Sequence, residues 1–328
     1  MKVAELLEKR RRNWQELECL CDDLHHRGKR AVTAETTMKF AALYRAACAD
    51  LALADAHQLP PNTVQYLHRL VGRAHNQLYR SRRFDFARWG QMLLHDAPQQ
   101  IFNDRCVQVA FVVFWGIFIL SALLANSSDQ FPHYADTVLT RAGIESLERN
   151  FAESLKDRDV SVNQSMAAFY IFHNTSIGLK CFATGVLVIP GLSIIVFNAA
   201  YLGAAFGYMA RPDVSEGVNF FEFVTAHGPF ELTAIVLSGG AGLRLGMAFL
   251  NTRGFTRIDS IRKTAAEAMP VMGAAMVMFF AAALIEGFVS PSSLPYWFKS
   301  LVAILSSGIL TFYFMVLGYP RGDFHAAR

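Results

Sequence analysis

Six apolar segments, each close to twenty residues long, follow one another in the last two-thirds of the chain. They lie at about 107–125, 169–189, 192–210, 230–250, 269–289 and 299–318. About 20 mostly apolar residues are needed for an α-helix to cross the hydrocarbon core of a bilayer. In lipid a helix satisfies its own backbone polar groups within the segment. We therefore predict an all-α fold, a polytopic transmembrane helical bundle with about six spans.

Charge divides the chain into two parts. Charged residues make up 18% of the sequence, against about 25% in an average soluble domain, and the first third carries a dense share of them. Apolar residues recur there at three- and four-residue steps, which predicts helices. We expect a cytosolic and interfacial helical domain over 1–105, in which 84–105 forms an interfacial helix. The transmembrane bundle then covers 106–328, with an outer amphipathic segment at 126–168.

Basic residues predict the orientation of the spans. Cytoplasmic loops of membrane proteins are enriched in Lys and Arg. The first third and the 251–268 loop are basic, whereas 126–168 and 211–229 carry more acidic than basic residues. We predict a multi-pass protein of the bacterial cytoplasmic (inner) membrane with both termini in the cytoplasm. The lipid bilayer is its first expected partner, and we expect no nucleic-acid partner.

Ionisable residues inside or beside the spans are candidates for function, because charge is costly in a membrane. The predicted topology gathers five of them in the outer half of the bundle and leaves two as buried charges deeper in it. The predicted functional polar cluster consists of His173, Glu222, His227, Glu231 and Glu286. The predicted buried charges are Lys180 and Arg244.

Several chemistries fit this cluster. His227 and Glu231 are four residues apart, hence on one helical face, and with Glu286 or His173 they offer a zinc ligand set. The alternatives are a proton- or ion-coupled pathway, an interhelical network that fixes the packing, and a solvated outer cavity that docks a partner. No complete catalytic constellation stands out. We therefore assign no catalytic residue and expect no cofactor, with zinc as the alternative.

Two pairs of glycines have the spacing of close helix packing. Gly203 and Gly207 are four apart in the third predicted span, and Gly242 and Gly246 are four apart in the fourth. Small residues at this spacing let helix backbones approach each other. The spacing fits contacts within the bundle and an interface of a homodimer equally well.

Three motifs carry a resemblance to a known family. They are His-Gly-Pro-Phe-Glu-Leu from His227, Ser-Gly-Gly-Ala-Gly-Leu-Arg-Leu-Gly from Ser238, and Glu-Gly-Phe-Val-Ser-Pro from Glu286. With them the chain resembles the stage II sporulation protein M family over nearly its whole length. The resemblance implies a multi-span protein of the cytoplasmic membrane. It also implies a role as membrane anchor or scaffold for peptidoglycan-degrading partners, and it brings no established catalytic residues.

The leading functional hypothesis is an integral membrane scaffold or assembly factor for envelope proteins, in particular cell-wall hydrolases. A transporter or permease-like protein with a polar outer-leaflet site is the first alternative. An intramembrane metalloenzyme that uses His227, Glu231 and Glu286 is the second. The sequence leaves enzymatic activity open.

Overall fold

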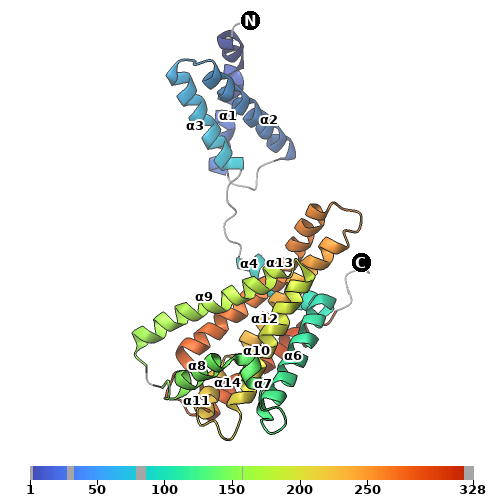
Figure 1. Ribbon diagram of the computed structural model, residues 1–328. Coiled ribbons are helices and arrows are strands. Elements are labelled where there is room, and N and C mark those ends of the chain that lie inside the picture. Colours follow the sequence, from blue (N-terminus) through green and yellow to red (C-terminus); the bar gives the residue numbers. More distant parts are fainter. Residues whose placement is uncertain (1–2, 28–32, 79–85, 157, 321–328) are drawn as a thin grey trace, which may run out of the picture. The chain divides into compact units, whose positions relative to one another are not determined.

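The computed structural model describes the chain except residues 1–2, 28–32, 79–85, 157 and 321–328 (Figure 1). The described residues form helices and no strands, which confirms the all-α prediction. The chain folds into two compact units, residues 1–85 and 86–328, and each is described here by itself.

The first unit is a bundle of three helices, α1 (Val3–Arg27), α2 (Ala34–Ala56) and α3 (Pro61–Leu78). Local sequence sets its boundaries: Thr33 caps α2 by accepting from the Thr36 amide at 3.2 Å, and Pro61 opens α3, where its missing N–H costs little. Trp14, Leu17 and Leu67 lie in its buried core. The carboxylate of Asp50, fully buried, accepts from Trp14 Nε1 at 2.8 Å and pairs with Arg10.

The second unit contains all remaining helices. It begins with the short elements α4 (Phe86–Gln91), the π-helical turn η2 (Met92–Asp96) and α5 (Ala97–Asn103), and three more short helices follow later in the chain. The others are α6 (Arg105–Asn126), α7 (Tyr134–Leu139), α8 (Arg141–Phe151), α9 (Val160–Thr184), α10 (Val188–Met209), α11 (Gly217–Val224), α12 (Gly228–Leu250), α13 (Arg257–Leu284) with the π-turn η3 (Ile285–Val289), and α14 (Tyr296–Thr311) with the π-turn η4 (Phe312–Leu317).

Helix α12 occupies the centre of this unit. It packs against α6, α9, α10, α13 and α14, and it is the most buried of the long apolar helices. Its residues from Ala234 to Leu243 are all buried. The bundle therefore has one helix shielded by the others, with α6 and α14 exposing more of their apolar surface.

Five described helices are long and apolar enough to cross a membrane: α6, α10, α12, α13 with η3, and α14 with η4. They match five of the six predicted spans. The prediction at 169–189 is the exception. That stretch belongs to α9, which has 25 residues but is not among the five apolar helices, and which ends at Thr184.

The predicted boundary between the second and third spans was wrong. The chain turns at Gly185–Leu187 rather than at Pro190-Gly191, which lie in the first turn of α10, a position that tolerates proline. The predicted outer segment at 126–168 contains two short helices, α7 and α8, and the start of α9. Thr140 separates α7 from α8 with a φ of 63° and caps α8 by accepting from the Gly143 amide at 3.2 Å.

Residues 86–103 belong to the second unit, whereas the predicted first domain extended to residue 105. The segment is broken into α4, η2 and α5 rather than forming one interfacial helix. It packs on α13 and η4, and Tyr313 donates to the Leu93 carbonyl oxygen at 2.6 Å. The break before α6 comes from Asp104, whose extended backbone starts the next helix.

Contacts at the two ends of α12 define two ends of the second unit. At what we call the near end, where the chain reaches α6, Arg244 contacts Asp104 and Gly246 lies against Gly185. At the opposite, far end, the start of α12 lies beside the end of α13, since His227 contacts Ser290 at 3.0 Å. These two ends carry the polar side chains considered next.

Candidate polar site at the far end

The start of α12 positions His227 and Glu231. His227 precedes the first turn of the helix, and Pro229 occupies an early position in it, where the lost N–H bond is not needed. Glu231 lies four residues on, so both side chains share one face. His227 Nε2 lies 3.6 Å from Glu231 Oε2, and the His227 side chain is 5% exposed.

The third member comes from the end of α13. The helix loosens there into the π-turn η3, and Glu286 lies in this turn with 9% exposure. π-turns occur often at functional sites because the extra residue redirects side chains. Asn174 of α9, which is buried, donates from Nδ2 to Glu286 Oε2 at 3.3 Å.

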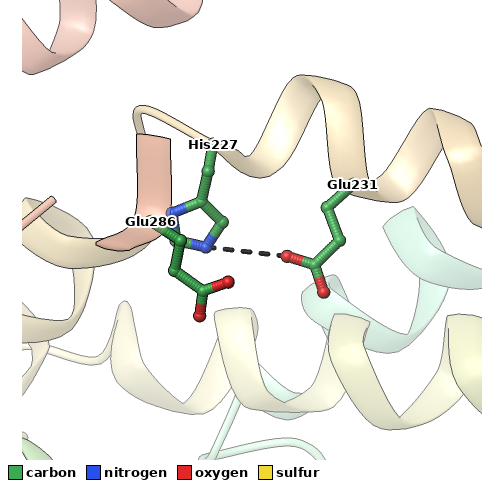
Figure 2. Close-up of side chains that lie close together, drawn as sticks. All are labelled: His227, Glu231 and Glu286. Atoms are coloured by element: carbon green, nitrogen blue, oxygen red, sulfur yellow. Dashed lines mark ion pairs between the residues drawn. The ribbon is translucent and has the colours of Figure 1, made fainter. Parts of the chain in front are cut away.

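These side chains converge on one space, as Figure 2 shows. One ligand atom each from His227, Glu231 and Glu286 can be chosen so that all three lie within 4.8 Å of one another. In the described part of the chain, neither carboxylate has a Lys or Arg nitrogen within 4.0 Å. Two acidic groups and an imidazole are thus brought together, and no Lys or Arg in the described residues forms an ion pair with them.

Ser290 extends the site toward α14. Its hydroxyl contacts His227 Nδ1 at 3.0 Å. Its carbonyl oxygen accepts from Lys299 Nζ at 2.6 Å, and Lys299 is 1% exposed. The imidazole is therefore held on one nitrogen while the other faces Glu231. Asn174, Ser290 and Lys299 were not predicted as site residues. Of the three only Lys299 is ionisable, and it was not considered because it lies at the very start of the predicted span 299–318.

Three predicted residues lie elsewhere. His173 is exposed and stacks on Phe169 with ring centroids 5.5 Å apart, so its neighbour Asn174 takes the inward position. Glu222 pairs with Lys156 at 2.6 Å. Lys180 is exposed and forms no ion pair among the residues that the structure describes, so it is not the predicted buried charge.

Arg244 belongs to a separate network at the near end. Its guanidinium contacts Asp104 Oδ2 and Glu267 Oε2, both at 2.9 Å. Asp104 is 9% exposed and also accepts from the Cys106 amide at 2.8 Å. The arginine is paired with two carboxylates from α13 and the start of α6, so it clamps three helices.

The predicted glycine pairs pack inside the bundle. A Cβ at Gly203 or Gly207 would lie 2.3 Å from the Phe118 carbonyl oxygen or 2.1 Å from that of Ala122, so both face α6. A Cβ at Gly242 would lie 2.5 Å from the Phe182 carbonyl oxygen, and one at Gly246 would lie 2.4 Å from the Gly185 carbonyl oxygen. Helix α12 stays regular through its glycines.

An apolar groove runs along the other side of α12. Its volume is about 980 Å³, and α6, α12 and α14 supply most of its wall. Phe102 of α5, which precedes α6, and Thr225 of the α11–α12 connection both line it. Aromatic residues of α6, among them Phe111, Trp115 and Phe118, line one side. The groove thus joins the near and far ends of the bundle.

Two family models match the chain. The model described as "Stage II sporulation protein M" matches residues 109–291, and one described as "Domain of unknown function (DUF8413)" matches residues 4–80. The first match contains His227, Glu231 and Glu286, which we call the far-end cluster. The second coincides with the three-helix unit. Neither the curated proteins nor the solved structures include a match.

Proposed function

This chain belongs to the stage II sporulation protein M family, and we propose that it is an integral membrane scaffold that assembles envelope proteins. The observation that carries the proposal is the apolar groove between α6, α12 and α14. We propose that its occupant is a membrane-spanning helix of a partner protein.

The groove matches about half the length of a spanning helix, which needs about 30 Å to cross the hydrocarbon core. Its α6 wall extends from Val107 to Phe118, about 17 Å of helix axis at 1.5 Å per residue. An occupant that fills it lies along the spans of the scaffold. A 20-residue helix about 10 Å across encloses roughly 2,400 Å³, so a groove of about 980 Å³ takes part of the helix and leaves its other face in lipid.

Polar groups in the wall favour a peptide occupant over an acyl chain. Gln108 donates from Nε2 to the Phe102 carbonyl oxygen at 2.7 Å, which leaves its amide oxygen as an acceptor. Thr233 and Thr311 also line the groove, and their hydroxyls donate to backbone carbonyl oxygens of their own helices. Their oxygens can accept interhelical bonds, which strengthen helix association in membranes.

The family resemblance supports envelope enzymes as the partners. We propose cell-wall hydrolases that carry one spanning helix. We further propose that the membrane is the bacterial cytoplasmic membrane, with both termini in the cytoplasm and the far end toward the envelope. The acidic bias of the loops at 126–168 and 211–229 supports this orientation.

Site-specific photocrosslinking tests the groove. A photoreactive phenylalanine analogue replaces Val112 of α6 or Met315 of η4, which line the groove from two different elements. Ile309 of α14 serves as the matched control, because it is 60% exposed against 58% for Met315 but lies outside the groove. We expect the two groove positions to capture the same envelope protein through its spanning segment, and Ile309 to capture it at least about tenfold less.

Three results would overturn the proposal. Adducts with lipid alone would assign the groove to acyl chains. Adducts with a second copy of the chain would assign it to a homodimer. Equal capture from Ile309 would mean that the envelope protein does not bind the groove in preference to the exposed surface outside it.

A further inference from the structure

We propose that His227, Glu231 and Glu286 bind a divalent transition-metal ion, and that the ion is zinc. The inference is independent of the scaffold role, since the groove and this cluster are built from different residues. It assigns a ligand to the far-end cluster, which the groove proposal leaves unexplained.

The distances suit a tetrahedral ion. Ligand atoms about 2.1 Å from zinc lie about 3.4 Å from each other. His227 Nε2 and Glu231 Oε2 are already 3.6 Å apart, and all three ligand atoms lie within 4.8 Å. Small side-chain rotations of the two carboxylates therefore complete the set, and one coordination position stays open for a water molecule.

The charges also require a cation or a proton. Glu286 is 9% exposed and the Glu231 side chain is 20% exposed. Two carboxylates this close cannot both stay ionised in a buried site without a counter-charge. Among the described residues, Lys299 donates to a backbone oxygen and Lys156 pairs with Glu222. A divalent ion supplies the missing charge.

Outer contacts hold the ligands as metal sites do. A ligating histidine usually engages a hydrogen-bond partner through its second nitrogen, and ligating carboxylates are themselves hydrogen-bonded. His227 Nδ1 contacts Ser290 Oγ at 3.0 Å, which leaves Nε2 for the metal. Asn174 Nδ2 donates to Glu286 Oε2 at 3.3 Å and leaves the other carboxylate oxygen available.

Ligand chemistry favours zinc over magnesium or calcium. An imidazole beside carboxylates suits zinc and other transition metals, whereas magnesium and calcium take oxygen ligands alone. Bound here, the ion would join the start of α12 to the end of α13, with α9 held through Asn174. The site is therefore a metal clamp on three helices with one exchangeable position.

Zinc titration of the purified full-length chain in lipid nanodiscs tests the site. The protein carries no polyhistidine tag, and zinc chloride is titrated against a chromophoric chelator. We expect one zinc per chain, and an affinity lowered more than about 100-fold by His227→Ala and by Glu286→Gln. Asn174→Ala removes an outer contact and should lower the affinity about tenfold.

Two variants serve as matched controls. His173→Ala removes the neighbouring exposed histidine, and Glu222→Gln removes a carboxylate that pairs with Lys156; both should leave zinc affinity unchanged. Circular dichroism and size-exclusion profiles confirm that each variant is folded. Substoichiometric zinc in the wild-type chain, or equal affinity in folded Glu286→Gln, would overturn the proposal, and neither outcome bears on the groove.

Discussion

Asp104 uses one carboxylate for two contacts. Oδ1 accepts from the Cys106 amide and caps α6, while Oδ2 contacts Arg244 of α12. The side chain is 6% exposed, whereas Glu267, the second partner of Arg244, is 45% exposed. The two acidic partners of one arginine therefore differ in how much each supports the fold.

Asp104→Ala should destabilise the chain by about 2–3 kcal/mol, because it removes a helix cap and leaves Arg244 with one exposed partner. Glu267→Gln should cost less than about 1 kcal/mol, as expected for a solvent-exposed pair. Thermal unfolding in detergent measures both. Equal effects of the two substitutions would contradict the unequal roles.

A shift of one residue decided which side chain of α9 joins the far-end cluster. Sequence reasoning chose His173 because it is ionisable, but Asn174 faces Glu286. Neighbouring residues on a helix point about 100° apart, so packing selects between them. Gly178 sits against Phe279, which sets the rotation of α9. The types of residue at positions 173 and 174 do not reveal how α9 is rotated about its axis.

Helix contacts in this bundle depend on missing side chains. Gly207 of α10 places its backbone against Ala122 of α6, where an added Cβ would lie 2.1 Å from the carbonyl oxygen. Gly116 of α6 has nothing within 4 Å of the same imagined atom. Both glycines lie within apolar helices, so they form a matched pair.

Gly207→Ala should separate α6 from α10 and destabilise the bundle by about 1–3 kcal/mol, the usual cost of overpacking. Gly116→Ala should be neutral or stabilising by up to about 1 kcal/mol, because alanine favours helix. Comparison of their melting temperatures in the same detergent measures the difference. A melting temperature in Gly207→Ala that matches the wild type would argue against close packing at this site.

The sequence predicted the helices more readily than the turns that connect them. The apolar runs predicted five of the long helices, because length and hydropathy are local properties. The turn at Gly185–Leu187 and the π-turn at Ile285–Val289 were not predicted. Both depend on neighbours: Gly185 lies against Gly242 and Gly287 against Ala167. The clustering of Glu286 with His227 was predicted, but the turn that enables it was not.

At the scale of the whole molecule, α9 decides the topology. Its 25 residues extend about 38 Å, enough to cross a bilayer, although it is less apolar than the five helices identified as candidate spans. It packs on α12 and α13. If α9 crosses, both termini share a side. If it does not, the loops after it reverse their sides.

Cysteine labelling from outside intact cells distinguishes these topologies. We expect Ser154→Cys, before α9, and Ser293→Cys, before α14, to react with a membrane-impermeant maleimide. Thr252→Cys, between α12 and α13, should react only after the cells are lysed. A chain in which α9 does not cross gives the opposite pattern at the two later positions, with Thr252→Cys labelled and Ser293→Cys protected.

The central helix α12 is joined to α13 at both of its ends. Arg244 contacts Glu267 at the near end, and His227 contacts Ser290 at the far end. Of the five apolar helices, α12 has the lowest mean hydropathy. During biosynthesis Asp104 is already present when α12 is made, but Glu267 and Ser290 can contact Arg244 and His227 only once α13 and the turn after it have been translated. The two helices should consequently leave the insertion machinery as a hairpin rather than one at a time.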